Sequence, residues 1–177
     1  DWNEEEPFPW NSGNFSSGFA HIMPDGNSMY FASDRPGGLG GFDIYVSYRT
    51  GDNNNSSWST PENLGPNINT PSDEITPYFD GRTLYFSSTW HNGYGGYDVF
   101  RSEGNNQQWG IARNMGVGIN SPRDDYGFIF DGVRSEGYFT SNRTQGAGSE
   151  DIYKASRQSS EVSLRVIAGT DRLPVQQ

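Results

Sequence analysis

Short runs of aromatic and branched apolar residues recur along this chain, separated by clusters of glycine, proline, asparagine and aspartate. Three of these runs occupy residues 29–33, 84–88 and 137–141. Runs of this length and composition are typical of β-strands. Their apolar residues are consecutive instead of alternating, which indicates strands buried on both faces. The chain also has 23 Gly and 10 Pro, too many interruptions for long helices, so the pattern predicts an all-β protein.

The runs belong to an internal repeat. Asp43, Asp98 and Asp151 each open an apolar run, and they lie 55 and then 53 residues apart. Other landmarks keep the same order: an Asp-Gly pair before the first run, a Gly-rich loop after it, and a tryptophan further on. These landmarks are Asp25-Gly26, Asp80-Gly81 and Asp131-Gly132, then Trp58 and Trp109. An Asp-Gly pair between two apolar runs is a strong hairpin signal, because a tight turn needs positive φ.

The landmarks of each unit therefore predict, in chain order, a strand, an Asp-Gly turn, a second strand, a Gly-rich loop, a third strand, a polar turn and a fourth strand that begins with tryptophan. The period is near the ~50 residues of kelch-type blades, and tandem four-stranded sheets buried on both faces describe a β-propeller. We expect an all-β propeller of four-stranded antiparallel blades, with three blades seen here. Because propellers close with about four to eight blades, we interpret the chain as half of a six-bladed one.

The repeat also sets the expected boundaries. Residues 1–18 end a preceding blade, and three blades follow at 19–74, 75–125 and 126–160. Residues 161–177 are either the last outer strand or the start of a following domain, and the second interpretation is favoured. The third unit departs from the pattern, because its loop at 144–150 has fewer glycines and no Trp-led strand follows it.

Composition narrows the function. The net charge of −10 argues against binding a nucleic-acid backbone or an anionic membrane surface. No apolar run approaches the length of a membrane span, so direct membrane insertion is not expected. The chain has no cysteine, which removes disulfides, thiolate metal sites and cysteine nucleophiles. No nucleophile-elbow or HExxH pattern occurs, so we expect no catalytic residues, no metal site and no cofactor.

Four residues after the second strands are candidates for binding a partner. Arg35 and Arg143 occupy matching places, and the second unit has Trp90 there, followed by His91. An arginine can pair with an anionic ligand, and an exposed tryptophan can anchor a partner. Equally, Arg35 and Arg143 could bridge neighbouring blades to Asp or Glu, and the sequence leaves both interpretations open.

Several carboxylates also recur. Asp43, Asp98 and Asp151 could form a ring that binds a cation, but their presence in every unit favours a structural role, accepting backbone N–H bonds from the Gly-rich loop. The pairs Asp73-Glu74 and Asp124-Asp125 lie in matching connections between units. Adjacent side chains diverge on an extended segment, so we expect solvated turns there instead of acid/base pairs.

The motif order resembles the WD40-like propeller repeat, also called PD40. The resemblance rests on Pro24-Asp25-Gly26, on residues 30–35 and on residues 37–45. Residues 58–65 and 67–70 bring it closer to the multidomain OmpA-family envelope proteins. These combine tetratricopeptide repeats, such a propeller, a carboxypeptidase-regulatory-like β-domain and a peptidoglycan-binding end. The resemblance covers about residues 11–156, and residues 166–177 resemble the opening of the regulatory-like domain.

The resemblance implies a periplasmic, outer-membrane-associated protein of a Gram-negative cell, and some such proteins are associated with type IX secretion. It implies a non-catalytic scaffold whose partners are proteins of the cell envelope. Peptidoglycan would be bound only through domains that this sequence does not contain. The alternative is a carbohydrate-binding or carbohydrate-processing propeller, suggested by the aromatic and acidic residues around Trp90.

Overall fold

A computed structural model describes residues 5–51, 57–105, 108–156 and 165–168. Within these ranges the chain is all-β: it forms fourteen strands and no helix. In particular, no helix in the described ranges is long and apolar enough to cross a membrane. The strands are β1 (Ser17–Ile22), β2 (Ser28–Ser33), β3 (Asp43–Thr50), β4 (Ser57–Trp58), β5 (Glu62–Asn63), β6 (Glu74–Phe79), β7 (Thr83–Ser88), β8 (Asp98–Asn105), β9 (Gln108–Trp109), β10 (Arg113–Asn114), β11 (Asp125–Asp131), β12 (Glu136–Ser141), β13 (Asp151–Ser156) and β14 (Arg165–Ala168).

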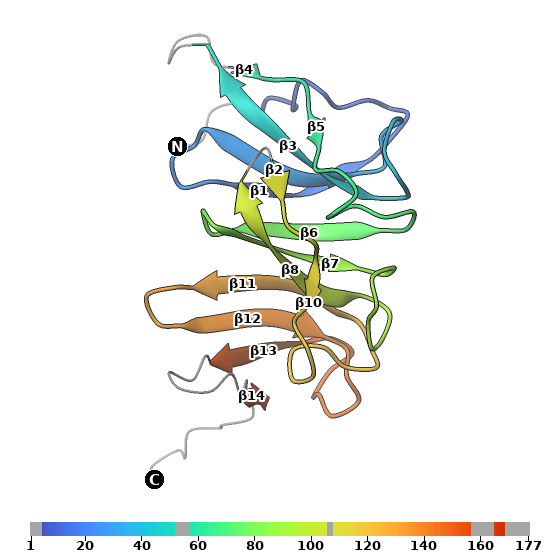
Figure 1. Ribbon diagram of the computed structural model, residues 1–177, viewed down its shortest axis with the longest axis vertical. Helices are drawn as coiled ribbons and strands as arrows, with labels where there is room; N and C mark the ends of the chain where they lie inside the picture. The colour runs from blue at the N-terminus through green and yellow to red at the C-terminus, as the bar shows by residue number, and fades with distance from the viewer. Residues whose placement is uncertain (1–4, 52–56, 106–107, 157–164, 169–177) are drawn as a thin grey trace.

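The strands form three antiparallel sheets that follow the repeat. The first sheet contains β1 to β5, the second β6 to β10 and the third β11 to β14. In each sheet the first three strands pair in chain order, and the outermost position is filled by short strands that pair with the third. The three sheets lie one above another along the long axis of the molecule (Figure 1).

The first hairpin of each sheet uses the Asp-Gly pair. Gly26 and Gly81 adopt φ of 71° and 96°, so the first two turns need the residue without a Cβ. The third turn differs from the prediction: Gly132 keeps negative φ, and Ser135, three residues later, adopts φ of 55°. Three residues separate Gly132 from the next strand, against one after Gly26 and one after Gly81, and the left-handed position lies at the last of the three.

The first strand of each sheet (β1, β6 and β11), which we call its innermost strand, carries a bulge at its third residue. Phe19, Thr76 and Gly127 occupy this place with φ of 55°, 52° and 69°, and the pairing with the next strand shifts there in all three sheets. Such φ values are strained for phenylalanine and threonine. The Thr76 hydroxyl offsets part of this cost, because it accepts a hydrogen bond from the Gly127 N–H on the next sheet.

The core lies between the sheets. Tyr30 and Ile44 of the first sheet pack with Phe86 and Phe100 of the second. The opposite face of the second sheet contributes Tyr85 and Val99, which pack with the third sheet through a further cluster that includes Ile119, Phe128, Phe139 and Tyr153. The middle strands of the first two sheets are therefore buried on both faces, as their consecutive apolar residues predict: β2 and β7 are buried at every position. The prediction is wrong for the third sheet, where β12 alternates buried and partly exposed residues, because a neighbouring sheet of the described chain covers only one of its faces.

The tryptophans mark the outer strands, but each outer strand is broken into two short pieces. Trp109 on β9 is 7% exposed, and its ring centroid lies 5.3 Å from that of Phe79. Trp58 on β4 packs instead against Phe8, and its backbone carbonyl accepts a hydrogen bond from the Trp10 indole. In the third sheet β14 takes the outer position by pairing with β13, so residues 165–168 lie where a last outer strand belongs.

Candidate functional site

The three Gly-rich loops leave their sheets on the same edge of the molecule, and the Asp-Gly hairpins lie on the opposite edge (Figure 1). We call the edge that carries the Gly-rich loops the loop edge; it consists of residues 34–42, 89–97 and 142–150. Each loop is fixed by the aspartate that ends it. Oδ2 of Asp98 accepts the Tyr94 and Gly95 N–H groups at 2.7 and 3.0 Å. Asp43 and Asp151 accept N–H bonds from Leu39 and Gly148 in the same way.

One glycine in each loop makes room for this carboxylate. A Cβ on Gly38, Gly93 or Gly146 would lie 2.0 Å from Oδ2 of the aspartate five residues later. This explains why the third loop keeps Gly146 although it has lost other glycines. One carboxylate oxygen of Asp43 and of Asp98 has no hydrogen-bond partner among the described residues, and burial raises the pKa of both groups. Their hydrogen bonds show that these aspartates hold the loops.

The first two loops also pack directly against the segment where the next sheet begins. A Cβ on Gly40 would lie 2.3 Å from the Thr70 carbonyl oxygen, and one on Gly95 would lie 2.1 Å from that of Arg123. Asp73 and Asp124 complete these junctions, because they accept the N–H groups of Phe42 and Tyr97 at 2.8 and 3.0 Å. The glycines therefore serve close backbone packing between sheets.

A buried asparagine joins each pair of sheets. Asn69 accepts the Ile44 N–H at 2.8 Å and donates to the Ile44 carbonyl at 2.9 Å, so its amide extends the sheet as a backbone group would. Asn120 does the same for Val99, at 2.8 Å in both bonds. These two residues are 1% and 3% exposed, and they satisfy the buried Ile44 and Val99 N–H groups, whose carbonyls also accept from Leu64 and Met115.

The sequence-based interpretation of two carboxylates is wrong. Glu74 and Asp125 were expected in solvated turns, but both are fully buried at the start of an innermost strand. The expectation that their side chains diverge from Asp73 and Asp124 holds, since the partners differ. The turn is not solvated because the preceding segment folds over the carboxylate: Thr70 and Ser121, four residues upstream, donate their N–H groups at 2.7 and 2.6 Å.

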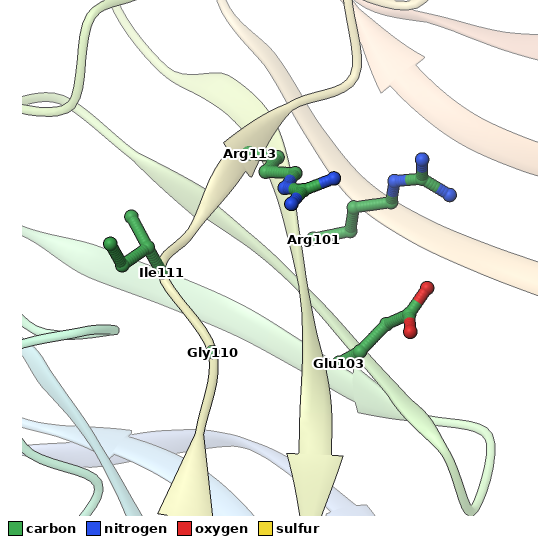
Figure 2. A pocket seen from close by; sticks show the side chains of 5 residues that line it. All are labelled: Arg101, Glu103, Gly110, Ile111 and Arg113. Carbon is green, nitrogen blue, oxygen red and sulfur yellow. The ribbon is translucent and has the colours of Figure 1, made fainter.

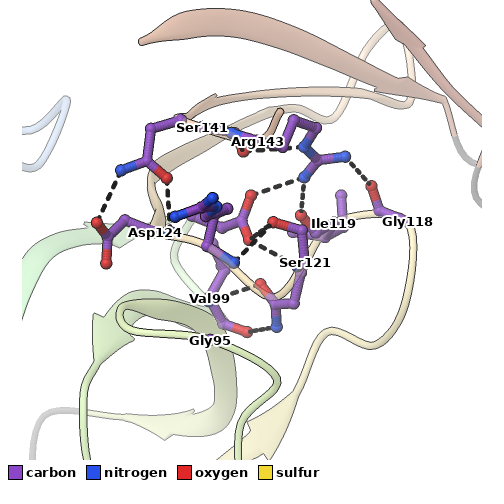
Figure 3. A network of polar contacts seen from close by, with 12 residues as sticks. Gly95, Val99, Gly118, Ile119, Ser121, Asp124, Ser141 and Arg143 are labelled. Carbon is purple, nitrogen blue, oxygen red and sulfur yellow. Dashed lines mark hydrogen bonds and ion pairs between the residues drawn. The ribbon is translucent and has the colours of Figure 1, made fainter. Parts of the chain in front are cut away.

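Arg143 belongs to a network of polar contacts at the junction of the second and third sheets (Figure 3). Its Nη2 lies 2.6 Å from Asp125 Oδ1 and donates to the Ile119 carbonyl oxygen at 2.6 Å. The guanidinium also stacks over the Phe139 and Tyr153 rings, at 5.2 and 4.6 Å from their centroids. The side chain is 16% exposed, so Arg143 binds its own chain and offers little surface to a partner.

In the second unit this place belongs to His91 and not to Trp90. The His91 ring lies 5.9 and 5.0 Å from the Phe86 and Phe100 rings, and its Nε2 bonds the Ile68 carbonyl at 3.0 Å. Ile68 corresponds to Ile119 in the repeat. The alignment by residue count had matched Trp90 with the arginines, and the structure shows a one-residue offset.

Arg35 lies over the corresponding pair of stacked rings in the first unit, 5.0 Å from the Phe31 and Tyr45 ring centroids. Ser17 takes the position that Glu74 and Asp125 hold in the other sheets, and Arg35 Nη2 donates to its hydroxyl at 3.2 Å. Burial lowers the pKa of the guanidinium, and the nearby Tyr45 opposes this effect. Of the four candidate residues, Arg35, His91 and Arg143 thus share one structural place, and Trp90 stands apart.

Trp90 belongs to an exposed apolar surface on the loop edge. It is 62% exposed, and Tyr94 and Leu39 are 50% and 43% exposed. Leu39 and Tyr94 each lie four residues before the loop aspartate, and Ala147 occupies this position in the third unit. We call Leu39, Trp90 and Tyr94 the loop-edge surface. Leu39 and Tyr94 were missed in the sequence, although their fixed spacing from the aspartate, at a loop tip, was a usable signal.

Hydrogen bonds hold the backbone that carries the loop-edge surface. The loops that carry it are held by the aspartate bonds described above, and the Trp90 N–H bonds the Ser88 hydroxyl at 3.1 Å. Among the described residues, no group of three or more histidine, aspartate or glutamate side chains is placed to hold a metal ion. Neither a protein-family model nor a curated protein sequence matches this chain.

Proposed function

We propose that the three sheets are blades of a β-propeller and that the chain is a non-catalytic scaffold, binding a protein partner through the loop-edge surface. The observation that carries the proposal is the exposure of Trp90, Tyr94 and Leu39 on loops whose backbone is fixed by buried carboxylates. Large apolar side chains held rigidly on a surface are the usual anchors of protein interfaces, because little conformational entropy is lost on binding.

The partner we propose is a protein of the Gram-negative cell envelope, at the periplasmic side of the outer membrane and within an assembly such as type IX secretion. Support for this location comes from the resemblance to the PD40 repeat of OmpA-family proteins. The acidic surface is consistent with it, since a net charge of −10 keeps a protein from adhering to anionic lipid headgroups.

The test is a capture experiment with a matched pair of variants. Trp90→Ala combined with Tyr94→Ala removes the aromatic anchors of the loop-edge surface. Val133→Ser removes an apolar side chain that is 95% exposed on the opposite, hairpin edge. We expect a protein captured from envelope extract by the wild-type chain to be retained by Val133→Ser and lost with the double variant. Equal capture by all three chains would contradict the proposal.

A second candidate function is carbohydrate binding, and the two exposed aromatic rings of Trp90 and Tyr94 favour it. An indole or phenol face offers a flat apolar surface with a polar edge, which suits a sugar ring. A glycan array separates the two candidates: saturable binding to a defined glycan that Trp90→Ala removes would favour the carbohydrate function. Absence of glycan binding together with loss of protein capture would favour the scaffold.

A further inference from the structure

Two arginines stand side by side at the outer edge of the second sheet. Arg101 on β8 and Arg113 on β10 are direct partners in the antiparallel register, so their side chains leave the same face of the sheet. Figure 2 shows the Arg113 guanidinium directed toward that of Arg101. Like charges placed directly opposite each other destabilise a sheet. The first sheet avoids this arrangement, because Val46 and Glu62 occupy the corresponding pair.

No carboxylate in the described part of the chain neutralises this pair. Glu103, two positions along β8, lines the same pocket, but the ion pair that it forms is with Arg82, at 3.5 Å. Neither Arg101 nor Arg113 takes part in an ion pair or side-chain hydrogen bond among the described residues. In a chain with only 12 basic residues and a net charge of −10, two uncompensated arginines in register are an unusual local excess of positive charge.

The arginines line a pocket of about 240 Å³, together with Glu103, Gly110 and Ile111. This volume is smaller than the ~300–1,000 Å³ of sites for drug-sized ligands, so the pocket suits a group of side-chain size. Two guanidinium groups present forked N–H donors that match the two oxygens of a carboxylate. Glu103 on the same wall disfavours a dianion such as phosphate, because the extra negative charge would face its carboxylate.

We propose that this pocket binds the carboxylate of an aspartate or glutamate side chain within a peptide segment of a partner protein. The anion supplies the negative charge that the Arg101–Arg113 pair lacks in the chain itself. The site lies on the outer strands of the second sheet and not on the loop edge, so it is independent of the proposed scaffold surface. It would remain if Trp90 and Tyr94 bound nothing.

The test is an NMR titration that follows the arginine Nε–Hε resonances of the full 177-residue chain. The probe is a ten-residue peptide of alternating glutamate and serine with both ends blocked, and the control probe carries glutamine for glutamate. We expect the glutamate peptide to shift the Arg101 and Arg113 signals in a saturable manner and the glutamine peptide to leave them in place. Arg113→Gln should reduce the affinity at least tenfold, and Arg123→Gln, an exposed arginine elsewhere, should not change it.

A stability measurement provides a second, independent readout. Without peptide, Arg113→Gln removes a like-charge contact and should raise the melting temperature by about 1–3 °C. With saturating glutamate peptide, the wild-type chain should gain stability and the variant should not. Equal shifts at Arg123, tighter binding of inorganic phosphate than of the peptide, or a destabilised Arg113→Gln chain would each overturn the proposal. Binding only by a peptide with a free C-terminal carboxylate would overturn the assignment to a side chain.

Discussion

The two junctions between sheets have the same backbone plan and different electrostatics. At the second junction, between the second and third sheets, the buried Asp125 is paired with Arg143 at 2.6 Å. At the first, the buried Glu74 has no ion pair among the described residues; Oε1 accepts the Thr70 and Ser88 hydroxyls at 2.6 and 2.7 Å. Ser88 donates to Glu74, whereas the equivalent Ser141 in the third sheet accepts a hydrogen bond from Arg143.

The difference shows that a repeat can keep a buried carboxylate while changing what compensates it. A longer glutamate reaches two hydroxyls, whereas a shorter aspartate relies on one hydroxyl and a guanidinium. Removing one partner of a buried ion pair strongly destabilises the fold, because the other charge stays buried without a countercharge. Hydroxyl groups can turn to suit a neutral acceptor. The two junctions should therefore respond differently to the same kind of substitution.

The largest effect is expected at the ion pair. Asp125→Asn leaves Arg143 largely buried without a countercharge, and we expect a loss of about 3–5 kcal/mol in unfolding free energy. Urea denaturation measures it. Asp131→Asn breaks the exposed Arg134 pair and is the control, which should change the unfolding free energy little because solvent screens this pair. Glu74→Gln at neutral pH should cost less than half of the Asp125→Asn loss, and an equal loss would remove the distinction between the junctions.

The next largest effect is expected in the loops. The comparison is between the first two loops, which pack against the following sheet, and the third loop. Gly40→Ala places a Cβ 2.3 Å from the Thr70 carbonyl oxygen, and relief of this clash should cost about 3 kcal/mol. Gly148→Ala is the matched control, since its nearest neighbour would be 3.4 Å away. We expect the control to change the melting temperature little. A control as damaging as Gly40→Ala would show that the third loop is equally crowded.

The asparagines provide a test of what the junctions share. Asn69→Ala and Asn120→Ala each leave one buried backbone N–H without its partner, at Ile44 and Val99. The carbonyls of these two residues still accept the N–H groups of Leu64 and Met115. We expect each to lower the unfolding free energy by about 2–3 kcal/mol. The two losses should agree within about 0.5 kcal/mol, because the geometry repeats. Unequal losses would mean that the two junctions differ in more than their charges.

The smallest effect concerns pH. Burial raises the pKa of Glu74 above its ordinary value of 4.5, and hydrogen bonds from Thr70 and Ser88, with His91 nearby, offset part of the rise. A carboxyl with a raised pKa in the folded state favours the fold below its ordinary pKa, and this contribution is lost as pH rises through the raised value. We therefore expect unfolding free energy to fall as pH rises above 4.5.

Asp43 and Asp98 have pKa values raised by burial and should act in the same direction, so the comparison needs a variant. Glu74→Gln should flatten the fall in unfolding free energy with pH, measured by denaturation at intervals between pH 4.5 and 7. An unchanged slope would show that Glu74 does not titrate differently in the folded and unfolded chain. Glu150→Gln, an exposed carboxylate, is the control.

Much of this molecule could be predicted from the order of its residues. The all-β class, the three units and the burial of β2 and β7 on both faces follow from consecutive apolar residues and their repeat. The same kind of run in β12 is buried on one face only, because that depends on which sheets flank it. The loop aspartates could be identified as structural, because a group that recurs in every unit serves the unit. These are local or periodic properties, so spacing along the chain contains them.

Tertiary structure alone decided which residues are buried and which are exposed at the junctions. Glu74 and Asp125 looked like solvated turn residues because no local pattern shows that the segment four residues upstream will fold over them. Counting residues matches Trp90 with Arg35 and Arg143, but in the structure His91 packs against the stacked Phe86 and Phe100 rings and bonds the Ile68 carbonyl from another strand connection. The sequence thus determined the strands and their repetition, through periodic burial. Only the packing of one sheet on the next decided the partners of each charge, because those contacts join residues far apart in the chain.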